Sequence, residues 1–176
     1  DVIVDSLGVV YIADRNNNRV RKIDRSGVIT TLMGLSQTEF NGDNEIAAET
    51  TLHLPFALTL IGEDRLLVVD RNHFRIREVK LQSSKVATIA GNGNFLFKGD
   101  GGPGSGATLE APSGIALDSK GNILFVDRLH QRIRKIDNKG FIDTVIGNGK
   151  QGNEGNGRAS IEATLHLPEV LIIDSE

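Results

Sequence analysis

Cysteine and tryptophan are absent from the 176-residue sequence, and tyrosine and methionine occur once each. Without cysteine the chain forms neither disulfides nor Cys-based metal sites, a composition that suits a reducing cytosol and also many exported bacterial proteins. No apolar run reaches the ~20 residues of a membrane helix, and no signal-peptide pattern is present. The net charge of −3 gives no general attraction to nucleic acid or to an anionic membrane. Because Asp1 is not a natural start, we expect an upstream segment.

One sequence motif occurs three times in the chain. Residues 11–24, 67–80 and 124–137 read YIADRNNNRVRKID, LVVDRNHFRIREVK and LFVDRLHQRIRKID. In each copy an apolar run ends at Asp-Arg, three residues intervene, and an Arg-[Val/Ile]-Arg run follows, a pattern typical of a β-hairpin. The aspartates, at positions 14, 70 and 127, lie 56 and 57 residues apart. A fixed period of this size indicates a repeat architecture.

The third copy shows the predicted plan of a repeat most clearly. Strands are expected over residues 113–118, 122–127, 132–137 and 141–146, with tight Asp-x-x-Gly turns between the first two and the last two. Four antiparallel strands in 34 residues form the meander of one propeller blade. We therefore predict an all-β propeller portion with blades at residues 1–33, 57–90 and 114–146, and the start of a fourth inner strand at 170–174.

Three segments of 22 residues each, 34–55, 91–112 and 147–168, connect the predicted blades. Loops of this length are uncommon in compact domains and tend to be functional or to hold local structure, and helical turns are expected within 47–52 and 159–165. In a four-stranded meander, the break after each Asp-Arg and the long loops lie on one face, which we call the loop-tip face. Any ligand site is expected there.

Several segments from the end of the second predicted blade through the third closely resemble NHL repeats: IAGNG at 89–93, GDGGP at 99–103, PSGIALD at 112–118, GNILFVD at 121–127 and RIRKI at 132–136. The Gly-rich insertion resembles that of bacterial extracellular NHL proteins and of teneurin-like propellers. This resemblance implies a β-propeller, usually of six blades, that serves mostly as a binding platform and says little about the ligand. It also favours an exported or cell-surface location.

Three blades are half of such a ring. An open arc would leave an apolar blade face bare at each end, and covering about 400 Å² at roughly 25 cal/mol/Å² contributes on the order of 10 kcal/mol. We therefore expect either a stretch of a longer propeller chain or two copies that close one ring. The predicted fourth strand favours the first, because it would duplicate the first strand of a partner copy.

Aspartate and arginine recur at each predicted hairpin, in the pairs Asp14 and Arg19, Asp70 and Arg75, and Asp127 and Arg132. A carboxylate at this point accepts turn amides and pairs with arginine, which fixes the corner. An active site needs one constellation of residues rather than three identical ones. We interpret these residues as structural and favour a function that is not enzymatic.

The predicted function is a binding or scaffold module that recognises a protein, peptide or glycan through the loop-tip face, with no cofactor and no membrane insertion. His73 and His130 are expected to be exposed on hairpin loops. The residues predicted to contact the ligand are groups at the loop tips: Arg15, Asn17, Phe40, Arg71, His73, Phe97, Asp100, Arg128 and His130.

A metal site is one alternative. His53 and His166 occupy the same place in Thr-Leu-His-Leu-Pro, and Glu110 lies next to the matching position, so these three could hold zinc in a propeller lyase or hydrolase. Calcium would use the loop acids Asp43 and Asp100. The asparagines near them are Asn41, Asn44 and Asn156, and the third loop has no matching aspartate.

RNA binding through the arginine-rich hairpins is the other alternative, because a positive face attracts phosphates. Against it, the net charge is negative, and only one Tyr and seven Phe are present to stack bases. Arginines that are solvated or paired within the chain are the favoured interpretation.

Overall fold

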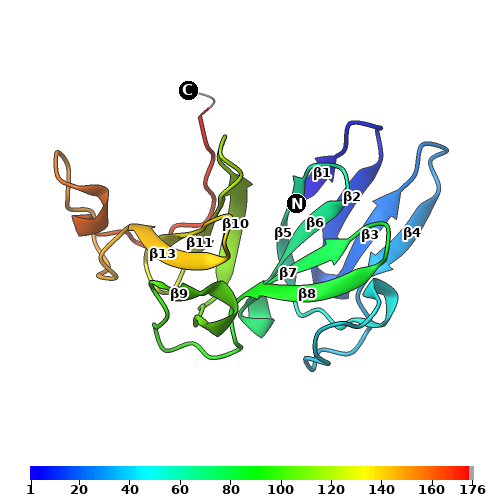
Figure 1. Cartoon of the computed structure of the whole chain (residues 1–176), viewed down its shortest axis with the longest axis horizontal. Helices are drawn as coiled ribbons and strands as arrows, with labels where there is room; N and C mark the ends of the chain where they lie inside the picture. Colours follow the sequence, from blue (N-terminus) through cyan, green and yellow to red (C-terminus); the bar gives the residue numbers. More distant parts are fainter. Residues whose placement is uncertain (175–176) are drawn as a thin grey trace. The chain divides into compact units, whose positions relative to one another are not determined.

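Three antiparallel sheets follow one another along the chain in the computed structural model, which describes residues 1–174 (Figure 1). Each contains four consecutive strands in chain order, which confirms the predicted four-stranded blades. Blade 1 holds β1 (Val2–Val4), β2 (Val10–Asp14), β3 (Arg19–Ile23) and β4 (Ile29–Met33). Blade 2 holds β5 (Pro55–Ile61), β6 (Arg65–Asp70), β7 (Arg75–Lys80) and β8 (Lys85–Ala90). Blade 3 holds β10 (Pro112–Leu117), β11 (Ile123–Asp127), β12 (Arg132–Ile136) and β13 (Phe141–Ile146).

The chain divides into two compact units, residues 1–88 and the residues from Ile89 onward. The first unit contains blade 1 and most of blade 2, and β8 carries the chain into the second unit, which contains blade 3. In the first unit, Met33 of blade 1 and Leu66 of blade 2 belong to one apolar core and are fully buried. Leu52, from the loop between these blades, joins the same core. The long loop therefore contributes to packing as well as to connection.

The core of the second unit is built on β11. Successive side chains of a strand point to opposite faces of its sheet, and both Phe125 and Val126 are fully buried. Ile142 of β13 and Leu109 of the long loop are also fully buried. Blade 3 thus buries both faces of its second strand, which explains the continuous apolar run before Asp127.

The short turns at the other end of blades 1 and 3 follow the predicted Asp-x-x-Gly pattern, whereas blade 2 has turns of other sequence over residues 62–64 and 81–84. In the turn between β12 and β13, Asp137 Oδ1 accepts hydrogen bonds from the amides of Lys139 and Phe141, both at 2.9 Å. The hydrogen bond from Phe141 is the main reason that the pKa of the Asp137 carboxyl is lowered. Gly140 closes the turn with φ of +83°, a conformation that glycine adopts without strain.

The long loops do not remain on the loop-tip face, where the sequence predicts them. The loop over residues 34–55 runs along the outer edge of blade 2, where Val86 N donates to Glu45 O at 3.1 Å and Asn44 N donates to Val86 O at 2.8 Å. In the loop over 91–112, β9 (Gly102–Pro103) pairs antiparallel with β13 as a fifth strand of blade 3. An outer strand otherwise presents unpaired amides and carbonyls, which the loop backbone satisfies.

The predicted helical turns are present as the short 3-10 turns η2 (Ala47–Glu49) and η5 (Ser160–Glu162), and η4 (Gly104–Gly106) is a further one. No helix within residues 1–174 is long and apolar enough to cross a membrane. The fourth inner strand predicted at 170–174 is not formed in the described chain. Gly114 N donates to Glu169 O at 2.9 Å, but the residues that follow Glu169 pair with no strand in the part of the chain that the structure describes.

Candidate functional site

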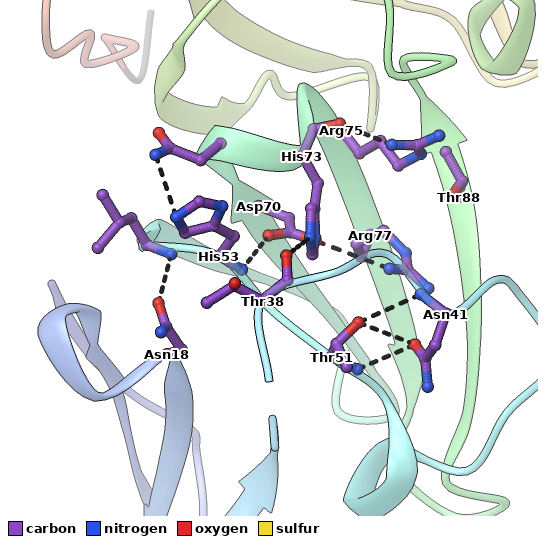
Figure 2. A network of polar contacts seen from close by, with 12 residues as sticks. Asn18, Thr38, Asn41, Thr51, His53, Asp70, His73, Arg75, Arg77 and Thr88 are labelled. Carbon is purple, nitrogen blue, oxygen red and sulfur yellow. Dashed lines mark hydrogen bonds and ion pairs between the residues drawn. The ribbon is translucent and has the colours of Figure 1, made fainter. Parts of the chain in front are cut away.

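A buried aspartate organises the hairpin end of blade 2 (Figure 2). Asp70, the last residue of β6, is fully buried, and its Oδ1 accepts a hydrogen bond from His53 N at 2.8 Å. Its Oδ2 lies 2.7 Å from His73 Nδ1. The other ring nitrogen of His73 donates to Thr38 O at 2.7 Å, because a carbonyl oxygen only accepts. His73 therefore joins the hairpin of blade 2 to the long loop that precedes the blade.

Blade 3 repeats this arrangement. Asp127 Oδ1 accepts from Glu110 N at 2.8 Å, and Asp127 Oδ2 lies 2.9 Å from His130 Nδ1. His130 Nε2 donates to Phe95 O at 2.6 Å. The prediction that His73 and His130 are exposed is wrong: both are buried, because a loop segment 35 residues earlier in the sequence covers each ring.

The surroundings of His130 favour its charged form. Burial alone lowers the pKa of the ring, but the hydrogen bond and charge of Asp127, the Phe95 carbonyl and the nearby charge of Glu110 together raise it above the ordinary value. Glu110 Oε2 lies 3.7 Å from His130 Nε2. A protonated ring has two N–H donors, and both of its nitrogens face acceptors in this blade.

Each histidine is followed two residues later by an arginine that stacks on a phenylalanine of the same long loop. The guanidinium carbon of Arg75 lies 3.7 Å from the ring centre of Phe40, and that of Arg132 lies 3.7 Å from the ring centre of Phe97. This is a cation–π contact within the usual range. Burial lowers the pKa of both guanidinium groups.

The next arginine of each hairpin is fully buried and binds a loop aspartate. Arg77 Nη2 donates to Gly42 O at 2.8 Å and to Asp43 Oδ1 at 3.1 Å, and Thr88 Oγ1 donates to the same carboxylate oxygen at 2.9 Å. Burial is the main reason that the pKa of Arg77 is lowered. The loop carboxylate thus supplies countercharge to a cation that has no access to solvent.

In blade 3, Arg134 Nη2 lies 2.8 Å from Asp100 Oδ1, and Arg134 Nη1 donates to Asp127 Oδ2 at 3.2 Å. Thr144 Oγ1 donates to Asp100 Oδ2 at 2.8 Å. The loop residues of the two blades read Phe-Asn-Gly-Asp at 40–43 and Phe-Lys-Gly-Asp at 97–100. We call these the Phe-x-Gly-Asp segments. Each segment supplies a countercharge to the buried arginine and fixes the long loop on its blade. We call a segment bound in this way a plug.

Blade 1 forms the same hairpin corner, but with other polar side chains around its aspartate. Asn17 takes the place of the histidine, and its Nδ2 donates to Asp14 Oδ1 at 2.8 Å. Arg21 Nη1 lies 3.7 Å from Asp14 Oδ2. Arg19 Nη2 donates to Ser36 Oγ at 3.1 Å.

Three arginines that directly follow the aspartates lie at the hairpin breaks. Arg15 and Arg71 have their guanidinium carbons 5.2 and 4.4 Å from the ring centre of Phe56, a residue that sequence reasoning missed. Arg128 Nε donates to Glu169 Oε2. Of the residues predicted to contact a ligand, Phe40, His73, Phe97, Asp100 and His130 therefore belong to the networks that fix the long loops on their blades, in which Phe97 and Asp100 remain exposed. Arg15, Asn17, Arg71 and Arg128 lie at the hairpin breaks.

The residues predicted as alternative metal ligands contact polar groups of the chain. His53 Nε2 lies 3.4 Å from Asn72 Nδ2, and His166 Nε2 lies 2.8 Å from Gln151 Nε2. The side-chain oxygen of Asn41 accepts from Thr51 (Figure 2). Among residues 1–174, no three His, Asp or Glu side chains form a cluster suited to a metal ion.

A group of apolar side chains at the loop tips of blade 3 was also missed. Phe95, Leu96 and Leu129 are 53%, 77% and 42% exposed, and we call them the loop-tip patch. Phe95 and Leu129 are joined through His130, which follows Leu129 and binds Phe95 O. A signal was available in the sequence: the matching positions of blade 2 hold the polar residues Thr38, Glu39 and Asn72.

The model of the Teneurin NHL domain matches residues 89–174 of the chain. Mouse Teneurin-3 is 34% identical over 152 residues, which cover 80% of this chain and 5% of Teneurin-3. Protein SUPPRESSOR OF QUENCHING 1, chloroplastic, of Arabidopsis thaliana is 31% identical over 148 residues, which cover 80% of this chain and 14% of that protein. The chain therefore spans only a small part of the length of these relatives.

A solved structure has a similar fold. An auxiliary nutrient binding protein from Bacteroides thetaiotaomicron superposes with a TM-score of 0.72 at 18% identity, over 97% of this chain and 41% of that one. The blades, their recurring Asp-Arg hairpins and the similarity to teneurins agree with one another. The chain belongs to the NHL-repeat family of β-propellers.

Proposed function

We propose that the chain is a non-catalytic binding module that recognises a protein, peptide or glycan through its loop-tip face. The observation that carries this proposal is the loop-tip patch. In a repeat protein, the residues that the scaffold needs recur from blade to blade, whereas Phe95, Leu96 and Leu129 replace polar residues of blade 2. Grouped, exposed apolar side chains mark interaction sites more often than single ones do.

The networks beneath the patch support the same proposal. Asp127 and His130 hold the Phe95 carbonyl in place, so the patch stands on a fixed backbone, and preorganised groups bind with a smaller loss of entropy. An exported or cell-surface location forms part of the proposal, because the Gly-rich insertions resemble those of extracellular NHL proteins.

The test exchanges the patch for the residues of blade 2, in the triple variant Phe95→Thr, Leu96→Glu, Leu129→Asn. Blade 2 holds these residues at the same backbone positions, so the variant is expected to fold with an unchanged circular dichroism spectrum. Peptide and glycan arrays are probed with both proteins. The ligands of the wild-type chain should bind the variant at least tenfold more weakly.

The matched control is Glu39→Gln, which changes an exposed loop tip of blade 2 and should leave binding unchanged. Two results contradict the proposal: ligands that bind the triple variant as well as the wild-type chain, or arrays on which the folded wild-type chain binds nothing.

A further inference from the structure

The three residues of the loop-tip patch are held in place by different groups. Leu129 N donates to a backbone carbonyl of the long loop at 3.2 Å, and Leu96 O accepts from the hydroxyl of Thr108. Neither contact involves a group that changes its charge near neutral pH. Phe95 O accepts from His130 Nε2 at 2.6 Å, and histidine does change its charge in this range. The hold on Phe95 is therefore the part of the patch that responds to pH.

Both ring nitrogens of His130 face acceptors. Nδ1 lies 2.9 Å from Asp127 Oδ2, and Nε2 lies 2.6 Å from Phe95 O. A neutral imidazole carries one N–H and serves one of these acceptors, whereas the protonated ring carries two and serves both. Glu110 Oε2 lies 3.7 Å from Nε2, so a second carboxylate favours a proton on this side of the ring. The arrangement is therefore that of the protonated ring.

Asp127 is held too firmly to follow a change in the ring. Its Oδ1 accepts from Glu110 N at 2.8 Å, and its Oδ2 accepts from Arg134 Nη1 at 3.2 Å. A hydrogen bond to a charged carboxylate is also stronger than one to a neutral carbonyl. When the ring loses one proton, the other therefore stays on Nδ1, between His130 and Asp127. Nε2 then presents a lone pair to the oxygen of Phe95, and two acceptors at this distance repel each other.

The charged groups that face His130 within residues 1–174 come from β11, β12 and the long loop. They are Asp127 of β11, Arg132 and Arg134 of β12, and Glu110 of the loop. In the described chain Glu110 belongs to no cluster suited to a metal ion. Burial lowers the pKa of the ring, but Asp127, the Phe95 carbonyl and Glu110 raise it by more. The proton is therefore lost at a pH above the ordinary value for histidine.

The acid and the apolar tips occur in the same blade. In blade 3 the amide that binds the buried aspartate belongs to Glu110, whose side chain faces the ring, whereas in blade 2 it belongs to His53. Blade 2 forms the same corner without this acid, so the fold does not require it. The position of Glu110, beside the ring that holds Phe95, connects it with the patch.

We propose that His130 is a pH-sensitive latch of the loop-tip patch: the protonated ring holds the Phe95 backbone against the hairpin, and the neutral ring releases the loop at Phe95. This inference rests on the proposed function, because it concerns ligand binding by the same patch. The ligand affinity is full while the ring is protonated, and it falls as rising pH removes the proton. The contacts of Leu96 and Leu129 remain, so the release is local and does not unfold the blade.

The structural test follows the whole chain by NMR across a pH titration, with signals assigned for the His130 ring and for the backbone amides of the patch. The Leu96 amide shares a peptide group with the Phe95 carbonyl, so its order parameter reports the release. It should fall from about 0.85 to below about 0.6 as the ring loses its proton, while that of Leu129 stays constant. The latch is excluded if Leu96 stays rigid while the ring titrates.

The functional test repeats the peptide and glycan arrays one pH unit below and one unit above the midpoint of the ring titration. Ligands that are lost in the triple variant bind through the patch. These should bind about tenfold more weakly at the higher pH, because the protonated fraction of the ring falls by about tenfold. Patch ligands that bind equally at both pH values overturn the latch and leave the proposed function standing. Arrays that stay blank at both pH values contradict the proposed function itself, and the latch with it.

The variant Glu110→Gln keeps the size of the side chain and removes its charge. It should lower the pKa of the ring, and the midpoints of ring titration, Leu96 release and ligand binding should move down by the same amount. His130→Gln should bind patch ligands more weakly and without this pH dependence, whereas His166→Gln, at an exposed histidine, should retain it. Thermal melts establish that the variants fold, and Glu110→Gln decides the question if His130→Gln does not. A ring midpoint that moves in Glu110→Gln without a matching move in ligand binding overturns the proposal.

Discussion

His130 Nδ1 lies 2.9 Å from Asp127 Oδ2 in the interior of blade 3. Because the other ring nitrogen binds a loop carbonyl, this contact is the link between hairpin and loop. The aspartate fixes the ring, the ring fixes the loop, and the loop positions the exposed patch. A change at the buried pair should therefore be measurable both in stability and at the loop tips.

Raising the pH should weaken the contribution of His130 to stability. Its pKa in the folded chain is raised above the unfolded value of about 6.5. The stability that it adds is therefore fully present below that value and is lost as the pH rises through the folded pKa. We expect the difference in free energy of unfolding between the wild-type chain and His130→Gln to shrink as the pH rises above the unfolded value, as measured by urea denaturation.

The control for this measurement is His166→Gln, at an exposed histidine. The difference in free energy of unfolding between this variant and the wild-type chain should not show the pH dependence expected for His130→Gln. A His130→Gln difference that stays constant, or that grows with pH, would show that the ring is not stabilised in its charged form.

Removing the carboxylate of Asp100 should destabilise the second unit. Arg134 is fully buried, and Asp100→Ala leaves it with Asp127 as countercharge. We expect a loss of about 1.5–3 kcal/mol, the usual contribution of a hydrogen bond to a charged group. The double variant Asp100→Ala, Arg134→Met should lose less than the sum of the single variants, because it leaves no buried charge behind.

Urea denaturation of the four proteins of this double-mutant cycle gives the coupling energy directly. Glu154→Ala, at an exposed position of the third loop, serves as the control and should change stability by less than about 0.5 kcal/mol. Strictly additive losses in the cycle would mean that the ion pair seen between Asp100 and Arg134 carries no net energy.

The blades could be predicted because their signals are local. Apolar runs of strand length, Asp-x-x-Gly turns and the period of the Asp-Arg hairpins each depend on a few neighbouring residues. The path of the long loops could not be predicted in this way. The pairing of β9 with β13 joins residues about 40 positions apart, and no local pattern marks Gly102 and Pro103 as a strand.

The same difference between local and nonlocal signals explains why the two histidines were wrongly predicted to be exposed. His73 and His130 stand in short polar breaks, which indicate exposed loops, and their covers come from Thr38 and Phe95. A nonlocal signal was nevertheless present. Phe-x-Gly-Asp begins 57 residues apart in the two loops, as do the two histidines that the loops cover, so comparing spacings between repeats would have linked loop and hairpin.

Glycine at the third position of the Phe-x-Gly-Asp segment should be required for folding of the plug. Gly99 has φ of +110°, and a Cβ there would lie 2.6 Å from Ala107 Cα. Both the backbone strain and the overlap oppose a side chain, so Gly99→Ala should cost about 2–5 kcal/mol, measured by thermal and urea denaturation. Gly106→Ala, where a Cβ meets nothing within 4 Å, should change stability by less than about 1 kcal/mol. Equal stability of the two variants would contradict this requirement. It would mean that close packing of the loop at Gly99 does not hold the Asp100 carboxylate against Arg134.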